Sequence, residues 1–316
     1  MPLTNQFSAT AIVPPVTYFV DNVYGDDALS GLSPGLAWKT IGRVNAGSFA
    51  PGDVVSFKRG TILPERLILP ASGVAGAHFI INAYGFGANP IIDGEDARWC
   101  ISGNGKSFVT IDGVDVKRSS NPGIYFDGTY SNITIRNLSA TDCAGHGIFF
   151  DESPSGLVTI TGVTSTGNTR SGLRIYDAED GGYIADSTFA SNSDHGIEAS
   201  NCIGFLVERI LSHSNSDGSG LGGDEFSYCT IQDSEFYDNR YGGVDLTGQA
   251  EACEYNIVRR NIFHSHTTLV YSGAVHMWTN GTAGHFSQYN EVYNNLFYGN
   301  NCAVFFGGQA QNNERG

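Results

Sequence analysis

A glycine followed by an aliphatic residue returns about every 24 residues through the middle of the chain. The steps begin at Gly123, Gly147, Gly172, Gly196, Gly220 and Gly243. A fixed period of this size indicates one supersecondary unit that is stacked repeatedly, with each repeat packing mainly on its neighbours. The repeat therefore constrains the fold before any single motif is interpreted.

Each period contains short apolar runs separated by turn residues. From Ile133 the chain reads Ile-Thr-Ile, Asn-Leu-Ser-Ala and Gly-Ile-Phe-Phe-Asp, and the period from Val158 repeats this pattern. Such runs predict strands and turns. Helical repeats need longer stretches without glycine, propeller blades need about 40 residues, and the Leu-x-x-Leu-x-Leu frame of leucine-rich repeats is absent. We therefore predict an all-β, right-handed, single-stranded parallel β-helix of about ten coils.

An asparagine column supports this register. Its members precede the glycine step or its equivalent by three to five residues, and they are Asn168, Asn192, Asn215, Asn239 and Asn300. Asparagine tolerates left-handed geometry and bonds to its neighbours in tight turns, so we expect a structural ladder. Cys143 stands where other coils carry the asparagine. The six cysteines have scattered spacing without a C-x-x-C pair, which predicts small buried residues rather than a metal cluster.

Composition excludes several classes of partner. The net charge of −15 argues against nucleic acids and anionic membranes, which are bound through Lys and Arg. No apolar run approaches the roughly 20 residues of a membrane span. The start of the sequence, from Met1 to Gln6, has neither a basic region nor an apolar core, so we expect no signal peptide in it.

The N-terminal part differs from the repeats. Tyr18 to Asn22 reads as a strand, a polar loop follows from Tyr24, and Trp38 to Asn45 reads as a short amphipathic helix. Because an open β-helix exposes the core of its first coil, we predict that residues 1–50 form a cap and residues 51–316 the β-helix. The absence of a closing helix near the end of the sequence predicts a truncated chain or a C-terminal partner region.

The same region carries a set of short motifs. They are Tyr18-Phe-Val-Asp, Gly25-Asp-Asp, Ser30-Gly-Leu-Ser-Pro, Trp38-Lys-Thr-Ile, Pro51-Gly-Asp-Val-Val-Ser-Phe-Lys-Arg-Gly, Ala83-Tyr-Gly-Phe-Gly and Pro90-Ile-Ile-Asp-Gly. Together they resemble the opening of right-handed β-helix proteins of the pectate-lyase-like group, which includes polysaccharide lyases, β-helix glycoside hydrolases, uronan epimerases and phage tailspike depolymerases. The resemblance implies a polysaccharide partner, an extracellular, cell-surface or virion location, and a homotrimer if the chain is tailspike-like. It assigns no reaction, because the motifs lie in cap and turns.

Candidate functional residues lie on the strand after each glycine step. The aliphatic residue points inward, so the next residue and the one two further on point outward. The first outward column reads Tyr125, Phe149, Arg174, Glu198, Gly222, Asp245, His276 and Phe305. The second reads Asp127, Asp151, Tyr176, Ser200, Asp224, Thr247 and Trp278. Since neighbouring coils lie about 4.8 Å apart, these residues are predicted to form one vertical patch.

The patch combines carboxylates with aromatic rings, a pairing that suits the hydroxyls and apolar faces of sugars. The alternative is a set of charges on a solvated sheet, but like charges on adjacent rungs repel each other. We predict catalytic roles for Glu198, Asp224, Asp245, Arg174 and His276. We predict substrate binding by Tyr125, Phe149, Tyr176, Trp278, His146 and His195.

Three chemistries fit this patch. In a hydrolase, Glu198 and Asp245 stand two rungs apart, about 9.6 Å between backbones, and no cofactor is required. In a lyase or uronan epimerase, Asp224 with Glu198, Asp245 and Glu225 would hold Ca²⁺. The base would then be Arg174, His276 or Tyr176. A spike that only binds glycan would need neither a catalytic carboxylate pair nor Ca²⁺. Several carboxylates, one arginine and no lysine favour hydrolysis slightly.

One further motif surrounds His146. The sequence Gly145-His146-Gly147-Ile148 resembles the Gly-His-Gly motif of polygalacturonases, but no Asn-Thr-Asp, Asp-Asp pair or Arg-Ile-Lys accompanies it. The tripeptide alone therefore favours a turn histidine over a catalytic one.

Overall fold

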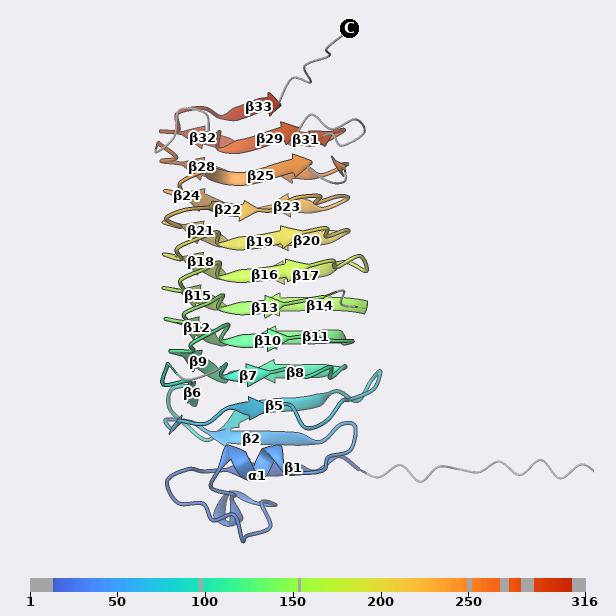
Figure 1. The fold of residues 1–316 in the computed structure, drawn as a ribbon, viewed down its shortest axis with the longest axis vertical. Helices are drawn as coiled ribbons and strands as arrows, with labels where there is room; N and C mark the ends of the chain where they lie inside the picture. The colour runs from blue at the N-terminus through green and yellow to red at the C-terminus, as the bar shows by residue number, and fades with distance from the viewer. Residues whose placement is uncertain are drawn as a thin grey trace, which may run out of the picture.

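A computed structural model describes residues 14–96, 99–152, 155–248, 252–267, 273–279 and 287–308. The chain forms a right-handed parallel β-helix, in which strands of successive coils stack along one long axis (Figure 1). Three parallel sheets of 11, 10 and 10 strands run along this axis. They correspond to the three apolar runs of each sequence period, so the predicted fold class is confirmed.

The 11-stranded sheet, named sheet A, contains the first strand of the described chain. In spatial order it comprises β1 (Thr17–Val20), β2 (Val54–Lys58), β5 (Phe79–Tyr84), β8 (Val109–Asp112), β11 (Ser131–Arg136), β14 (Ser155–Thr161), β17 (Gly182–Ala185), β20 (Phe205–Glu208), β23 (Thr230–Gln232), β27 (Ile257–Arg259) and β31 (Glu291–Tyr293).

Sheet B follows sheet A in each coil. It comprises β3 (Ile62–Leu63), β6 (Ile91–Asp93), β9 (Asp115–Lys117), β12 (Ser139–Thr141), β15 (Thr164–Thr166), β18 (Thr188–Ala190), β21 (Leu211–His213), β24 (Glu235–Tyr237), β28 (Ile262–His264) and β32 (Leu296–Tyr298).

Sheet C carries the strands that begin at the glycine step. It comprises β4 (Leu67–Ile68), β7 (Ile101–Ser102), β10 (Ile124–Phe126), β13 (Ile148–Phe150), β16 (Leu173–Tyr176), β19 (Ile197–Ser200), β22 (Ser219–Gly222), β25 (Gly242–Gly248), β29 (Val275–Thr279) and β33 (Val304–Gly308). A small pair of strands, β26 (Cys253–Glu254) and β30 (Ser287–Gln288), completes the strand set of the described residues.

Helical structure in the described ranges is confined to the N-terminal end. It consists of the 3₁₀ turn η1 (Pro34–Leu36) and the helix α1 (Ile41–Asn45), which Thr40 caps by accepting a hydrogen bond from the Arg43 amide. The helix is shorter than predicted, because Trp38 lies outside it and bridges to Val20 instead. The division at residue 50 stays a prediction, although β1 already forms the outer strand of sheet A.

The repeated glycine is required by close approach of the neighbouring turn. A Cβ on Gly147 would lie 2.0 Å from Ser165 Oγ, and one on Gly196 would lie 2.1 Å from Ser212 Oγ. Real Cβ atoms do not approach other atoms so closely, so a side chain here would push adjacent strands apart. The period first visible in the sequence is therefore a packing requirement of the coil.

The asparagine ladder is confirmed as a structural element. The Asn192 backbone amide donates to Asn215 Oδ1 at 3.1 Å, and the Asn215 backbone amide donates to Asn239 Oδ1 at 3.2 Å. At its start the Cys143 amide donates to Asn168 Oδ1 at 3.1 Å. Nearer the C-terminal end, His266 replaces one asparagine and its Nδ1 accepts from the Asn239 amide at 3.3 Å. These side chains satisfy buried backbone donors that would otherwise lack a partner.

The cysteines behave as small apolar residues. All six thiols lie in the described ranges and are free, and five of them are buried; Cys302 is half-buried. Within the same ranges, no helix is long and apolar enough to cross a membrane.

Candidate functional site

The first outward column on sheet C has the predicted register. Tyr125, Phe149, Arg174, Glu198 and Gly222 lie opposite one another on successive strands. The column continues through Asp245, His276 and Phe305, and the pairing of Leu221 with Val244 joins the two halves. Residues separated by more than a hundred positions in the sequence therefore share one face of the molecule.

The second column also follows the prediction at the described pairs. Tyr176 lies opposite Ser200, Asp224 lies opposite Thr247, and Thr247 lies opposite Trp278. Glu225 follows Asp224 in a left-handed conformation with φ of 65°. The predicted residues thus line one face, although not all of them contact one another.

Glu198 on β19 is held by two side chains of this face. Arg174 on β16 places Nη1 3.4 Å from Glu198 Oε1, and Ser171 Oγ donates to Glu198 Oε2 at 2.7 Å. The Arg174 guanidinium also lies over the Phe149 ring, 5.3 Å from its centroid. The Glu198 side chain is only 17% exposed, so these contacts hold it in one orientation.

Asp245 and His276 form a second pair, on β25 and β29. His276 Nδ1 lies 3.1 Å from Asp245 Oδ1, and Thr247 Oγ1 donates to the same oxygen at 2.7 Å. The imidazole packs between Trp278 and Phe305, with ring centroids 5.8 and 5.3 Å away. This pair lies two rungs from Glu198.

The intervening rung has no side chain of its own, and the His195 ring occupies it. A Cβ on Gly222 would lie 2.5 Å from His195 Nδ1 and 2.6 Å from its Cε1. The Ser219 amide donates to Nδ1 at 2.9 Å, so the neutral ring carries its proton on Nε2, which lies 3.4 Å from Asp194 Oδ1. The imidazole therefore stands on the column between the two carboxylates.

His146 occupies the equivalent place two coils earlier. Its Nδ1 accepts from the Ser171 amide at 3.2 Å, and its ring lies 5.0 Å from that of Phe149. Burial lowers the pKa of His146 to about 4, opposed by the nearby Glu198 carboxylate and assisted by Arg174 and Arg170. The ring is therefore neutral at neutral pH.

Sequence reasoning missed three residues of this face. Trp99 packs on Tyr125 with centroids 4.5 Å apart, and it was missed because its coil has no glycine step. Ser171 was detectable from its position, because it directly precedes the glycine step at Gly172, as His146 and His195 precede the steps on the coils before and after it. Asp194 precedes His195, and its pKa is raised, mainly by burial and further by the Glu198 and Asp217 carboxylates.

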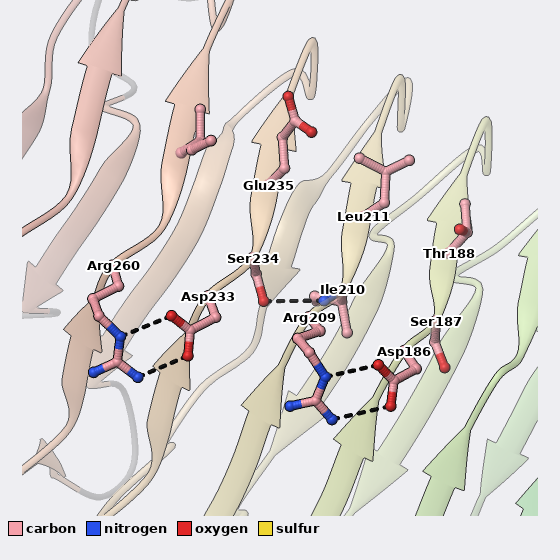
Figure 2. Close-up of a pocket in the computed structure, with 11 residues that line it drawn as sticks. Asp186, Ser187, Thr188, Arg209, Ile210, Leu211, Asp233, Ser234, Glu235 and Arg260 are labelled. Atoms are coloured by element: carbon pink, nitrogen blue, oxygen red, sulfur yellow. Dashed lines mark hydrogen bonds and ion pairs between the residues drawn. The ribbon is translucent and has the colours of Figure 1, made fainter.

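A separate pocket lies at the bend between sheets A and B (Figure 2). Its volume is about 790 Å³. It is lined by Asp186, Ser187, Thr188, Arg209, Ile210, Leu211, Asp233, Ser234, Glu235, Arg260 and Ile262. The predicted columns did not include these residues, because those columns followed the strand after the glycine step and these bends lie elsewhere in each coil.

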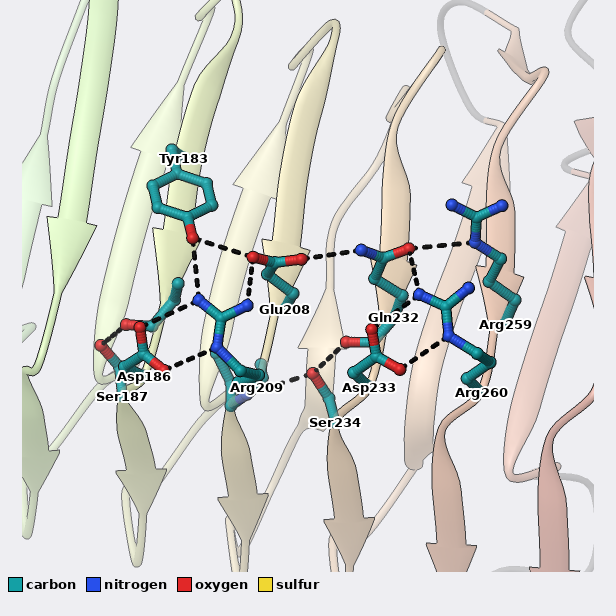
Figure 3. A network of polar contacts seen from close by, with 12 residues as sticks. Tyr183, Asp186, Ser187, Glu208, Arg209, Gln232, Asp233, Ser234, Arg259 and Arg260 are labelled. Carbon is teal, nitrogen blue, oxygen red and sulfur yellow. Dashed lines mark hydrogen bonds and ion pairs between the residues drawn. The ribbon is translucent and has the colours of Figure 1, made fainter.

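Four charged groups of this pocket form two ion pairs. Arg209 donates to both oxygens of Asp186 at 2.7 and 3.0 Å, and Arg260 donates to both oxygens of Asp233 at 2.7 Å. Figure 3 shows that the network continues across the ends of the sheet A strands through Glu208. Opposite charges alternate on successive coils, so we interpret the network as a ladder that stabilises the bend.

Several solved structures share this architecture. The chain superimposes on GH136 lacto-N-biosidase from Eubacterium ramulus with a TM-score of 0.71 and 15% identity, covering 93% of this chain and 67% of that one. It superimposes on pectate lyase Pel9A with a TM-score of 0.64 and 17% identity, covering 90% and 80%. It superimposes on the alginate lyase from a Paenibacillus species with a TM-score of 0.60 and 13% identity, covering 84% of this chain and 97% of that one. Identities this low establish the shared fold alone.

Sequence comparison gives a more specific result. A comparison with curated proteins finds no match. The family model described as "Periplasmic copper-binding protein (NosD)" matches residues 100–286, which is more than half of the chain and includes most of sheet C. The chain therefore belongs to the NosD family.

Proposed function

We propose that this protein is an enzyme that cleaves glycosidic bonds of a polysaccharide bound along the outer face of sheet C. The observation that carries the proposal is the first outward column. It places Glu198, held by Arg174 and Ser171, two rungs from Asp245, held by Thr247 and His276. Towards its N-terminal end the same column carries the aromatic rings of Phe149 and Tyr125.

We favour hydrolysis with inversion among the cleavage reactions. Two rungs place the Glu198 and Asp245 backbones about 9.6 Å apart, and carboxyl groups about 6.5 to 9.5 Å apart leave room for a water molecule beside the sugar. Glu198 would accept a proton from that water as its oxygen bonds to the anomeric carbon. Asp245 would donate a proton to the glycosidic oxygen as the C–O bond breaks, with His276 beside it.

The test is incubation with a panel of polysaccharides, following reducing ends and the absorbance of unsaturated uronates together. Hydrolysis releases reducing ends without new absorbance. Glu198→Gln and Asp245→Asn should each lower the rate at least about a hundredfold, whereas Glu291→Gln, at an exposed position on sheet A, should not. Equal rates for all three variants would contradict the assignment.

A calcium-dependent lyase or epimerase is the second candidate. It is favoured by the adjacent carboxylates Asp224 and Glu225, which follow β22; Asp224 lies opposite Thr247 of the second outward column. Ca²⁺ bound there would neutralise a uronate before its proton is removed. New absorbance that EDTA abolishes would support this reaction instead of hydrolysis.

The family description raises copper as a ligand, and the described donors do not fit it. Within the described ranges, no group of three or more His, Cys, Asp or Glu side chains is arranged to hold a metal ion. Copper selects thiolate, thioether and imidazole ligands. Burial raises the pKa of Cys143 to about 11 and that of Cys202 to about 12, so these thiols are protonated at neutral pH. No step of the proposed reaction uses copper.

We also propose a location outside the cytoplasm, in the periplasm or beyond it. The proposal is supported by the family description, which names a periplasmic protein. Cell fractionation of the producing organism tests it. A non-catalytic, trimeric spike would instead bind glycan without releasing products and would elute as a trimer in light scattering.

A further inference from the structure

The outer face of sheet C has two halves of different chemistry. Towards the N-terminal end it carries the rings of Trp99, Tyr125 and Phe149, with centroids 4.5 and 5.4 Å apart along the column. Towards the C-terminal end it combines the carboxylates Glu198 and Asp245 with His276, which packs between the rings of Trp278 and Phe305. The aromatic half, named here the ring wall, adjoins the proposed reaction centre without a gap, because Phe149 lies under Arg174.

The ring wall differs in geometry from the stacked aromatic column on sheet B. On sheet B, His213, Tyr237 and His264 are stacked almost in parallel, with interplanar angles of 6°. Parallel rings cover one another's faces and leave mainly edges exposed. In the ring wall the angles are 48° and 47°, so each ring covers its neighbour only in part. All three side chains are half-buried, and the accessible part of each ring offers the apolar surface against which sugars pack their C–H groups.

The charges of this face disfavour an anionic chain. The two outward columns contain five carboxylates, which are Asp127, Asp151, Glu198, Asp224 and Asp245. One guanidinium, that of Arg174, stands among them and is paired with Glu198. A second, that of Arg66, lies over Trp99, 4.6 Å from the ring centroid. Together with the net charge of −15, these groups repel a polyuronate that arrives without a cation.

We infer that the ring wall is the binding site for a neutral polysaccharide, which runs along the helix axis from Trp99 towards Glu198. This inference rests on the proposed function and adds the class of substrate to it. Successive rings stand about one coil apart, and one hexose unit spans about the same length. Hydroxyls at the sugar rims would meet the polar groups beside the rings, such as Asp151, which accepts a hydrogen bond from Tyr125 Oη at 2.8 Å.

Binding is tested on the Glu198→Gln protein, so that cleavage does not interfere. Calorimetric titrations would compare neutral xylo-, manno- and cello-oligosaccharides with oligogalacturonate and oligoalginate, each with EDTA and with Ca²⁺. We expect at least one neutral series to bind, with affinity that rises with oligomer length over three or four units. Trp99→Ala and Phe149→Ala should each weaken this binding about tenfold. Tyr255→Ala, in an exposed column of stacked tyrosines at another corner, is the matched control and should not change it.

The outcomes separate this inference from the proposed function. Tighter binding of the uronates, with or without Ca²⁺, would overturn it, and so would neutral binding that both ring-wall variants retain. Melting temperatures show whether Trp99→Ala or Phe149→Ala is misfolded. If one of them is, the binding measured with the other variant tests the inference. Neutral binding by Glu198→Gln, without any cleavage by the unmodified protein, would support the ring wall while refuting the enzyme. If the unmodified protein cleaves only a polyuronate, the result would support the enzyme and refute the ring wall as a site for neutral polysaccharide.

Discussion

Protonation of His146 should destabilise the protein, and the loss in free energy of unfolding follows from its lowered pKa. Burial holds the pKa of His146 at about 4, whereas an unfolded histidine titrates near 6.5. Because the folded pKa is the lower one, the unfolded chain binds this proton first as the pH falls. The contribution to stability is complete above pH 6.5 and is lost between about pH 6.5 and pH 4. The interval of about 2.5 pH units corresponds to a loss of about 3 kcal/mol.

His146→Asn is the matched variant, because Asn Oδ1 can stand where His Nδ1 accepts from the Ser171 amide and does not titrate. Urea unfolding followed by circular dichroism at pH 7 and pH 4 gives the free energy of unfolding of both proteins. We expect the unmodified protein to lose about 3 kcal/mol more than the variant between these values. His78, His213 and His266 also have lowered pKa values, but they are present in both proteins and cancel. Losses that agree within about 1 kcal/mol would refute the reasoning.

Three other predictions follow from close contacts and donor sets. Gly222→Ala should displace the His195 ring from the amide of Ser219 and lower cleavage at least about tenfold with the fold retained; unchanged kcat/KM would show that the ring has no role. Asn215→Ala removes the acceptor of the Asn192 amide in a buried ladder and should cost about 3 kcal/mol by urea unfolding, and a loss below about 1 kcal/mol would contradict the ladder's importance. Calorimetric titration with Cu²⁺ and with Cu⁺ under reducing conditions should show no tight, stoichiometric site, and such a site would refute the donor argument.

The sequence predicted the fold and the outward columns well because both depend on the same period. A side chain that follows an inward aliphatic residue on a strand must point outward, so Arg174, Glu198 and Asp245 could be aligned across several coils without a structure. The prediction extended from Tyr125 to Phe305 wherever the glycine step or its equivalent could be recognised.

What the period could not predict is the position of side chains that leave their own rung. His195 belongs to one coil but its ring lies over Gly222 of the next, and only three-dimensional packing shows this. Trp99 joins the ring wall from a coil whose step reads Cys-Ile, so pattern matching passed over it. The helix from Trp38 was predicted too long because the tryptophan bridges to a strand, a tertiary contact that local amphipathicity does not reveal.

The asparagine ladder also bears on how this molecule could change in evolution. Its rungs from Cys143 to Asn239 are bonded to residues 23 to 25 positions away, which is one complete coil. Duplication or loss of one such segment would place an equivalent asparagine on each side of the junction, and the register of the three sheets would continue. The outer face of sheet C could therefore lengthen or shorten by whole coils while the Arg174–Glu198 and Asp245–His276 pairs stay intact. If that face binds a polysaccharide as proposed, chain length and the length of the bound glycan could evolve together.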